Sequence, residues 1–453
     1  MLRQRPGDPP KRPCRQTTNH LSQLRMTEAE PSRLQVVFFS ISRRSTILIN
    51  ALLGLSMPSR LFLPVLALVV FFVGATEFMI APILTPIASA FDVSPAAASW
   101  LISGYALSYA IGAPIIGLLA HKIDRKQLLL CALALLAADG LAVAFAPTLG
   151  SAILLRVLGG AAAAALIPAT FALIADRLPD ADHARAMGLV MLGMTAGIAL
   201  GPPLAGVLTQ MIGWRAPFLA SAAGCLALML PVNLILKTES PPPFRQGRLC
   251  FKDLKRTILM LIAAKALWNG SAVAAFGLSG EFLRERFTID TFQTGLSVAA
   301  FGIGLAFGNL SIGNAKRLLR DDQTLLLGAL LLLAFTLNLF LFAPLPLYGA
   351  VLCLGGWGVA LGFAAPASTA MIAQRAGREK GFLLALSESA NNLALLSMLS
   401  VAALLLEAFG AKVAGATLGF GLSFGAGLLL LYILVQSRVR RCAAGPCGTC
   451  QRD

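Results

Sequence analysis

Hydrophobic residues occur along this chain in long runs, which short segments rich in Gly, Pro or charge interrupt, from Leu61 to Val435. Most runs are about twenty residues long, and a helix of about 20 residues spans the ~30 Å apolar core of a bilayer. The pattern predicts twelve membrane spans, at about 61–82, 97–120, 127–147, 150–174, 186–211, 216–237, 256–279, 292–314, 323–343, 346–373, 382–408 and 413–436.

Composition supports this reading. The 453 residues are 57% hydrophobic and 13% charged, whereas soluble domains carry about a quarter charged residues. These values exclude a conventional soluble protein, a disordered chain and a disulfide-stapled scaffold. The expected fold class is an all-α integral membrane protein with twelve helices in two six-helix halves.

The formal net charge of +16 would suggest nucleic-acid binding in a soluble protein. Here the basic residues fall between alternate spans, as the positive-inside rule requires of cytoplasmic loops. Loops on one side hold 17 Lys and Arg and loops on the other side hold four, Arg215, Arg284, Arg286 and Lys412. We therefore expect both termini in the cytoplasm, the lipid bilayer as partner and no nucleic acid.

The polar, basic and Pro-rich segments between the apolar runs predict the boundaries of the domains. Residues 1–56 read as a disordered extension without a signal-peptide pattern, and Met57 looks like a start in its own right. Residues 57–237 form the first half, and residues 256–437 form the second. The basic, Pro-rich segment 238–255 reads as a cytoplasmic linker, and residues 438–453 as a cytoplasmic tail.

The sequence contains no recognisable motif for catalysis or for binding a cofactor. The eight cysteines show no pairing pattern, and Cys442, Cys447 and Cys450 in the tail are one ligand short of a structural zinc site. A G-x-x-x-x-G-K-[ST] phosphate loop is absent, which argues against ATP-driven pumping. We expect no cofactor, no metal and no catalytic residue.

Three glycine and charge motifs resemble those of the major facilitator superfamily. Gly117, His121, Asp124 and Arg125 lie in a basic loop after the second span, where the family has glycine, an acidic residue and a basic run. His121 takes the usual aspartate position, so Asp124 could replace it in a gating charge pair. The alternative is a plain basic loop.

Span 4 carries Arg156, followed four positions later by a glycine, as in the same family. A guanidinium inside an apolar helix is costly unless a polar cavity or partner receives it. The resemblance implies that Arg156 faces the central cavity and modulates proton release. The alternative is that it extends to the membrane surface.

Span 5 has the most specific pattern. Its small residues and proline allow close, bent helix packing, and the spacing resembles the drug:proton antiporter branch of the superfamily, although packing alone can also explain it. The members of this span-5 motif are Gly188, Gly197, Gly201, Pro202 and Gly206.

Glu77 lies inside span 1 in a Thr-Glu-Phe context that looks like bacterial sugar and drug efflux permeases. Desolvation favours the neutral form of a carboxyl group, which would let Glu77 bind and release protons near neutral pH. A structural carboxyl group that bonds to a neighbouring helix is the alternative. We predict that Glu77 and Arg156 couple transport to protons.

Other side chains inside spans are candidates for the cavity. The fold that the resemblance implies places spans 1, 4, 7 and 10 around the cavity, which favours Lys265. The sequence favours a structural or interfacial role for Asp139, and Glu388 is expected in a polar patch of the second half. The cavity candidates are Lys265, Asn269, Tyr105 and Trp357.

These features together predict a monomeric, proton-coupled secondary transporter in the bacterial inner membrane. It would export a small organic compound by alternating access. A proton-coupled importer of the same fold, a non-transporting sensor and a lipid-modifying enzyme remain alternatives. The identity of the substrate is open.

Overall fold

The structure is a computed structural model that describes residues 61–119, 123–236, 256–319, 321–376 and 380–444. The predicted extension 1–56, the linker 238–255 and residues 445–453 of the tail lie outside the described residues. By density of contacts, Ser56–Asp453 forms one compact unit, and the description below concerns that unit.

Every regular element in the described residues is helical. The elements are α2 (Phe62–Phe78), the 3₁₀ helix η1 (Ala81–Ile83), α3 (Leu84–Ala90), α4 (Pro95–Ala98), α5 (Trp100–Leu119), α6 (Arg125–Ala144), α7 (Leu149–Arg177), α8 (Asp180–Met211), α9 (Ala216–Ile235), α10 (Arg256–Gly277), α11 (Ser279–Phe287), α12 (Thr291–Leu319), α13 (Asp322–Phe342), α14 (Leu347–Arg375), α15 (Lys380–Phe409) and α16 (Ala411–Ala444). Twelve helical segments of this part of the chain are long and apolar enough to cross a membrane. They confirm the predicted spans.

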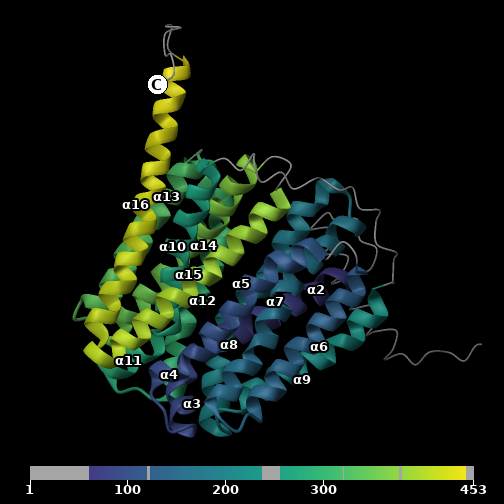
Figure 1. Cartoon of the computed structure of the whole chain (residues 1–453), viewed down its shortest axis with the longest axis vertical. Coiled ribbons are helices and arrows are strands. Elements are labelled where there is room, and N and C mark those ends of the chain that lie inside the picture. Colours follow the sequence, from purple (N-terminus) through teal and green to yellow (C-terminus); the bar gives the residue numbers. More distant parts are fainter. Residues whose placement is uncertain (1–60, 120–122, 237–255, 320, 377–379, 445–453) are drawn as a thin grey trace, which may run out of the picture. The chain divides into compact units, whose positions relative to one another are not determined.

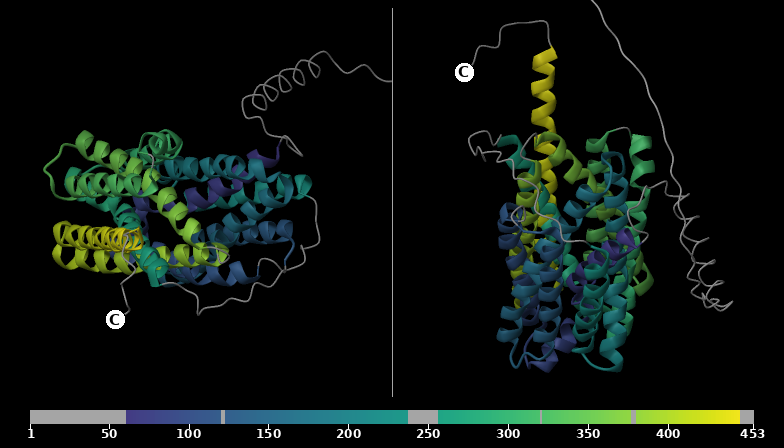
Figure 2. Two further views of the ribbon diagram at one scale, coloured as in Figure 1. Left: turned by 90° about the horizontal axis from the view of Figure 1, so that it is seen from above. Right: turned by 90° about the vertical axis from the view of Figure 1, so that its right-hand side faces the viewer.

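The helices form two sets, as the views along and across the bundle show (Figures 1 and 2). In the first set α2 packs on α8, α7 on α5 and α6, and α6 on α9. In the second set α14 packs on α12 and α13, and α10 on α15 and α16. The sets meet mainly where α8 packs on α12 and where α5 packs on α15. The predicted all-α fold with two six-helix halves is therefore confirmed.

Because successive spans are antiparallel, the bundle has two distinct ends. We call the end that contains Phe62, Arg177 and Arg375 the basic end. We call the end that contains Ala90 and Thr291 the opposite end. In the described residues, the basic end carries more Lys and Arg than the opposite end.

The first span extends beyond its predicted limit at residue 82. It continues through η1 and α3 to Ala90, with an interruption at two prolines. Pro82 has no N–H to donate to the carbonyl of Phe78, and Pro86 has none for the carbonyl of Pro82. The prolines therefore break the α-helical ladder without ending the span.

Span 5, which is helix α8, packs closely on both halves. A Cβ atom added at Gly197 would collide with the carbonyl oxygen of Phe71 in α2. Near the opposite end, a Cβ at Gly206 would lie 2.8 Å from the carbonyl oxygen of Thr291 and 3.2 Å from Cα of Gly295 in α12. A Cβ atom added at Gly188 would have no other atom within 4 Å. Close backbone approach therefore explains Gly197 and Gly206, but not Gly188.

We predict that Gly197→Ala lowers the free energy of unfolding by about 1–3 kcal/mol, because its methyl group forces α8 away from α2. Gly188→Ala, on the same helix, is the matched control and should leave stability unchanged or raise it by up to about 1 kcal/mol, because its methyl group meets open space and alanine favours the helix. Unfolding of the purified protein in detergent measures both. Equal stability of the two variants would show that the close approach at Gly197 is not required.

Candidate functional site

Charged side chains well inside the spans come from five helices. They are Glu77 in α2, Asp139 in α6, Arg156 in α7, Lys265 in α10 and Glu388 in α15. Both cations of this group are paired with carboxylates, one pair in each half.

The pair of the first half joins Arg156 to Asp139. The Arg156 guanidinium donates to a carboxylate oxygen of Asp139, and both side chains are almost completely buried, 1% and 0% exposed. The guanidinium carbon also lies 4.7 Å from the centre of the Tyr105 ring. Because Arg156 is buried, the alternative in which it extends to the membrane surface is wrong.

Arg156 also reaches the backbone next to Glu77. Its second terminal nitrogen donates to the carbonyl oxygen of Thr76 over 3.2 Å. This carbonyl belongs to the last turn of α2, where helical carbonyls lack partners within the helix. The Thr76 hydroxyl in turn lies 2.7 Å from the Ser221 hydroxyl of α9. Arg156 thus fixes the chain on which Glu77 is carried.

The pair of the second half joins Lys265 to Glu388. The Lys265 ammonium donates to the Glu388 carboxylate over 2.9 Å and to the Thr369 hydroxyl over 3.0 Å. Asn391 donates to the other carboxylate oxygen of Glu388 over 3.1 Å. The Lys265 side chain is 3% exposed and that of Glu388 is 44% exposed. The carboxylate therefore faces accessible space and the cation lies behind it.

Glu77 differs from these paired groups. It lies near the middle of the span Phe62–Ala90 and is partly exposed. Within the described part of the chain, its carboxyl group makes no hydrogen bond or ion pair. The alternative of a packing carboxyl group that bonds to a neighbouring helix is therefore not what the structure has. Glu77 is thus the partly exposed and unpaired member of these five charged groups in the described residues.

The remaining cavity candidates have different surroundings. Tyr105 is buried under the Arg156 guanidinium, and Asn269 is half-buried on α10. Trp357 of α14 is fully buried among aromatic rings, with Phe301 5.5 Å and Phe340 6.2 Å from its ring centre. The Trp357 ring therefore packs against other aromatic rings.

The loop motif after the second span is only partly described. His121 lies outside the described residues. The Asp124 carboxylate accepts from the backbone N–H of Gln127 over 2.9 Å and caps α6. Arg125 pairs with Asp176 at the end of α7 over 3.4 Å. These contacts connect neighbouring helices of the first half at the basic end.

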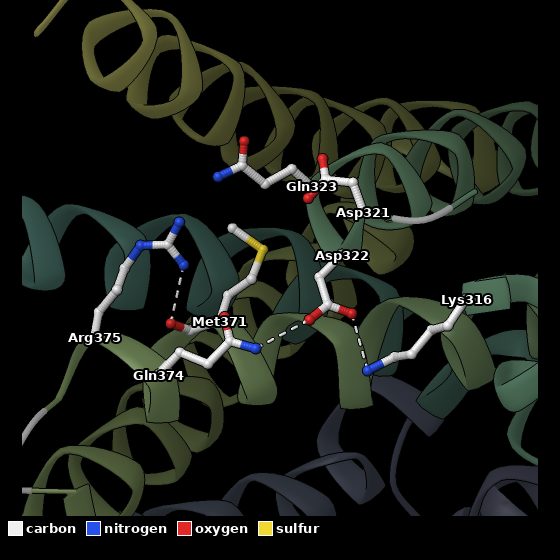
Figure 3. A pocket seen from close by; sticks show the side chains of 7 residues that line it. All are labelled: Lys316, Asp321, Asp322, Gln323, Met371, Gln374 and Arg375. Atoms are coloured by element: carbon white, nitrogen blue, oxygen red, sulfur yellow. Dashed lines mark hydrogen bonds and ion pairs between the residues drawn. The ribbon is translucent and has the colours of Figure 1, made fainter. Parts of the chain in front are cut away.

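A polar pocket of about 490 Å³ lies at the basic end of the second half (Figure 3). In it Asp322 at the start of α13 pairs with Lys316 over 2.9 Å and accepts from Gln374 of α14 over 3.2 Å (Figure 3). The contact from α13 to α14 parallels the contact from α6 to α7 made by Arg125. The pocket belongs to this connection at the helix ends and not to the charged groups inside the spans.

Sequence reasoning missed the partners of the two buried cations. The expected structural role of Asp139 and polar patch at Glu388 take the form of ion pairs, with Arg156 and with Lys265. The requirement that a buried charge be paired was the available signal, but the sequence does not say which carboxylate meets which cation.

Comparisons with known proteins agree with the fold. A model of the Major Facilitator Superfamily matches residues 66–282. The inner membrane transport protein YdhP of Escherichia coli O157:H7 is 27% identical over 395 residues, which cover 83% of this chain and 96% of that protein. A chloramphenicol resistance protein of Streptomyces lividans is 28% identical over 315 residues, covering 68% and 79%.

Among solved structures, the fold is similar to that of a bacterial homolog to the human lysosomal transporter Spinster, in an inward-facing and occupied conformation. The TM-score is 0.68 at 18% identity, with 83% of this chain and 97% of that chain covered. At this identity the likeness concerns the fold alone.

We predict that Asp139→Ala lowers the free energy of unfolding by about 3–5 kcal/mol, because it leaves the Arg156 charge buried without its partner. The double variant Asp139→Ala, Arg156→Met should recover most of the loss, since no buried charge remains. Asp176→Ala, which breaks the more exposed pair with Arg125, is the control and should cost less than about 1 kcal/mol.

Unfolding of the purified variants in detergent decides between the outcomes. Equal costs for Asp139→Ala and Asp176→Ala would show that the buried pair has no special importance for stability.

Proposed function

We infer that the chain is a multi-pass membrane transporter of the major facilitator superfamily rather than an enzyme. On this premise, we propose that it exports a small organic compound in exchange for protons. The observation that carries the proposal is the Glu77 carboxyl group, which is partly exposed inside a span and has no partner among the described residues. Carboxyl groups inside membrane spans mark proton relays in transporters.

In the proposed cycle the proton binds at the Glu77 carboxylate. The neutral form costs less to bury than the charged form, so proton binding favours a conformation in which Glu77 is enclosed. The Arg156 charge next to Thr76 favours the charged form of Glu77 and promotes release of the proton. Asp139 neutralises the charge of Arg156. The attraction of Arg156 for the Glu77 carboxylate is therefore weaker, and Glu77 can still take up a proton.

Lys265 and Glu388 occupy the second half of the same central region. Their mutual ion pair neutralises both charges, so neither acts as an isolated charge in the resting site. The partly exposed Glu388 and Glu77 carboxyl groups are polar groups available to a substrate. Alternating access then follows from rocking of the two six-helix halves about the α8–α12 and α5–α15 contacts.

Export from the bacterial cytoplasm is the proposed direction. The span-5 motif and the likeness to a chloramphenicol resistance protein favour export. The proposed location is the inner membrane, with both termini in the cytoplasm and the basic end facing it, as the distribution of Lys and Arg favours. A monomer is the proposed functional unit. Import by the same fold is the competing direction.

We predict that inverted membrane vesicles with the wild-type protein release protons from their acidified lumen when a substrate is added. A fluorescent pH indicator follows the release while chloramphenicol, other drugs, sugars and nucleosides are tested in turn. Glu77→Gln should reduce substrate-dependent proton release at least about a hundredfold, because the amide cannot carry the proton.

Glu285→Gln is the control, because Glu285 is an exposed carboxylate on α11 and should leave proton release unchanged. Uptake of the labelled substrate in the same vesicles shows the direction of transport. Unchanged proton release in Glu77→Gln would remove Glu77 as the carrier. Uptake that is independent of the proton gradient would contradict proton coupling.

A further inference from the structure

A buried polar cluster connects the two halves at the opposite end of the bundle. Glu281 and Arg284 on α11, in the second half, contact the end of the first span, in the first half. The Thr85 hydroxyl donates to the Glu281 carboxylate over 2.8 Å and accepts from the Arg284 guanidinium over 2.9 Å. Arg284 also pairs with Glu281 over 3.3 Å, so one hydroxyl of the first half bridges an ion pair of the second.

A proline supplies a second acceptor for Arg284. The carbonyl of Pro82 lacks a helical donor because Pro86, four residues later, has no N–H. Arg284 donates to this carbonyl over 2.7 Å and to the Thr291 hydroxyl over 3.1 Å. The break in the first span therefore creates the site that α11 occupies.

The cluster is largely removed from solvent. The side chains of Arg284 and Glu281 are 13% and 11% exposed. Burial raises the pKa of the Glu281 carboxyl group, while the hydrogen bond from Thr85 and the charge of Arg284 oppose the rise. Burial also lowers the pKa of the Arg284 guanidinium, against the attraction of Glu281. Hydrogen bonds to charged groups are worth most in such surroundings.

Two other arginines at this end show similar chemistry within one half. Arg215 donates to the carbonyl of Ala144 at the end of α6 over 2.9 Å. Arg286 donates to the carbonyls of Phe340, over 3.1 Å, and Ala343 at the end of α13. Each connects helices of its own half. Arg284 differs because its acceptors Thr85 and Pro82 lie in the other half.

Further contacts join the two halves at the opposite end. A Cβ atom at Gly280 of α11 would collide with the carbonyl oxygen of Ala81, and Ser94 donates to Glu407 of α15 over 3.0 Å. The Arg284 cluster thus lies where the halves must separate if the opposite end is to open.

We propose that Thr85, Glu281 and Arg284 form a latch that holds the two halves together at the opposite end and breaks each time that end opens. The latch rests on the proposed alternating access, because a protein that stayed in one conformation would not need to release it. Breaking it exposes two charged groups and a free carbonyl to water, which then satisfies them.

Distance measurements between the two halves test the latch. The eight native cysteines are first replaced by Ser. Spin labels are then attached at Phe145→Cys, after α6, and at Tyr348→Cys, in α14. Both positions lie at the opposite end of the bundle, where Phe145 and Tyr348 are 73% and 74% exposed. Pulsed electron paramagnetic resonance in lipid nanodiscs gives the population with a long distance. Arg284→Gln should raise the ratio of long-distance to short-distance molecules about tenfold or more, because charge-assisted bonds between the halves are lost.

Arg286→Gln is the matched control on the same helix and should change that ratio less than twofold. Thr85→Val keeps both charges and the side-chain volume, and should raise the ratio by a smaller factor than Arg284→Gln; it also tests the latch if Arg284→Gln does not fold. An unchanged ratio in Thr85→Val and in any folded Arg284→Gln protein, or an equal rise in Arg286→Gln, would overturn the latch.

The readout needs neither substrate nor proton flux, so the two proposals can fail separately. A shifted ratio in a protein that moves no protons would support the latch and count against proton-coupled export. Substrate-driven proton release with an unchanged ratio would support proton-coupled export and count against the latch.

Discussion

A cation inside an apolar helix bundle requires a partner, because lipid and hydrocarbon side chains cannot solvate its charge. This constraint organises the centre of the molecule. Arg156 is buried against Asp139 in the first half, and Lys265 against Glu388 in the second. Each pair fixes two spans to each other, and Arg156 adds a third by its bond to Thr76. With both cations satisfied, Glu77 is left as the carboxyl group without a described partner.

Both close backbone packing and polar contacts hold the two halves together. Glycines of α8 let its backbone approach α2 on one side and α12 on the other, so this helix belongs to the first half and also borders the second. The hydrogen bonds and ion pairs that cross between the halves at the opposite end are directional, and water can replace each of them. A tightly packed half and a replaceable contact between halves are what rocking of two rigid bodies requires.

The spans could be predicted well because apolar length is a local property, and the basic loops follow from local charge. The sequence does not predict that the first span continues past residue 82, because Pro82 and Pro86 look like an ending. A tertiary contact, the hydrogen bond from Arg284, replaces the bond lost at the carbonyl of Pro82. Helix α11 was missed because it is short and polar. The ion pairs join residues 17 and 123 positions apart, and no periodicity encodes such a pairing. Trp357 shows the same limit, since a sequence cannot say whether an aromatic ring packs or lines a cavity.

The central claim is that Glu77 exchanges its proton for substrate. The most direct measurement is the proton release that accompanies substrate binding to the purified protein in weakly buffered solution, followed with a pH indicator at equilibrium. The account predicts about one proton released per substrate bound in the wild-type protein and none in Glu77→Gln. Substrate binding without proton release in the wild-type protein, or equal release in the variant, would contradict it.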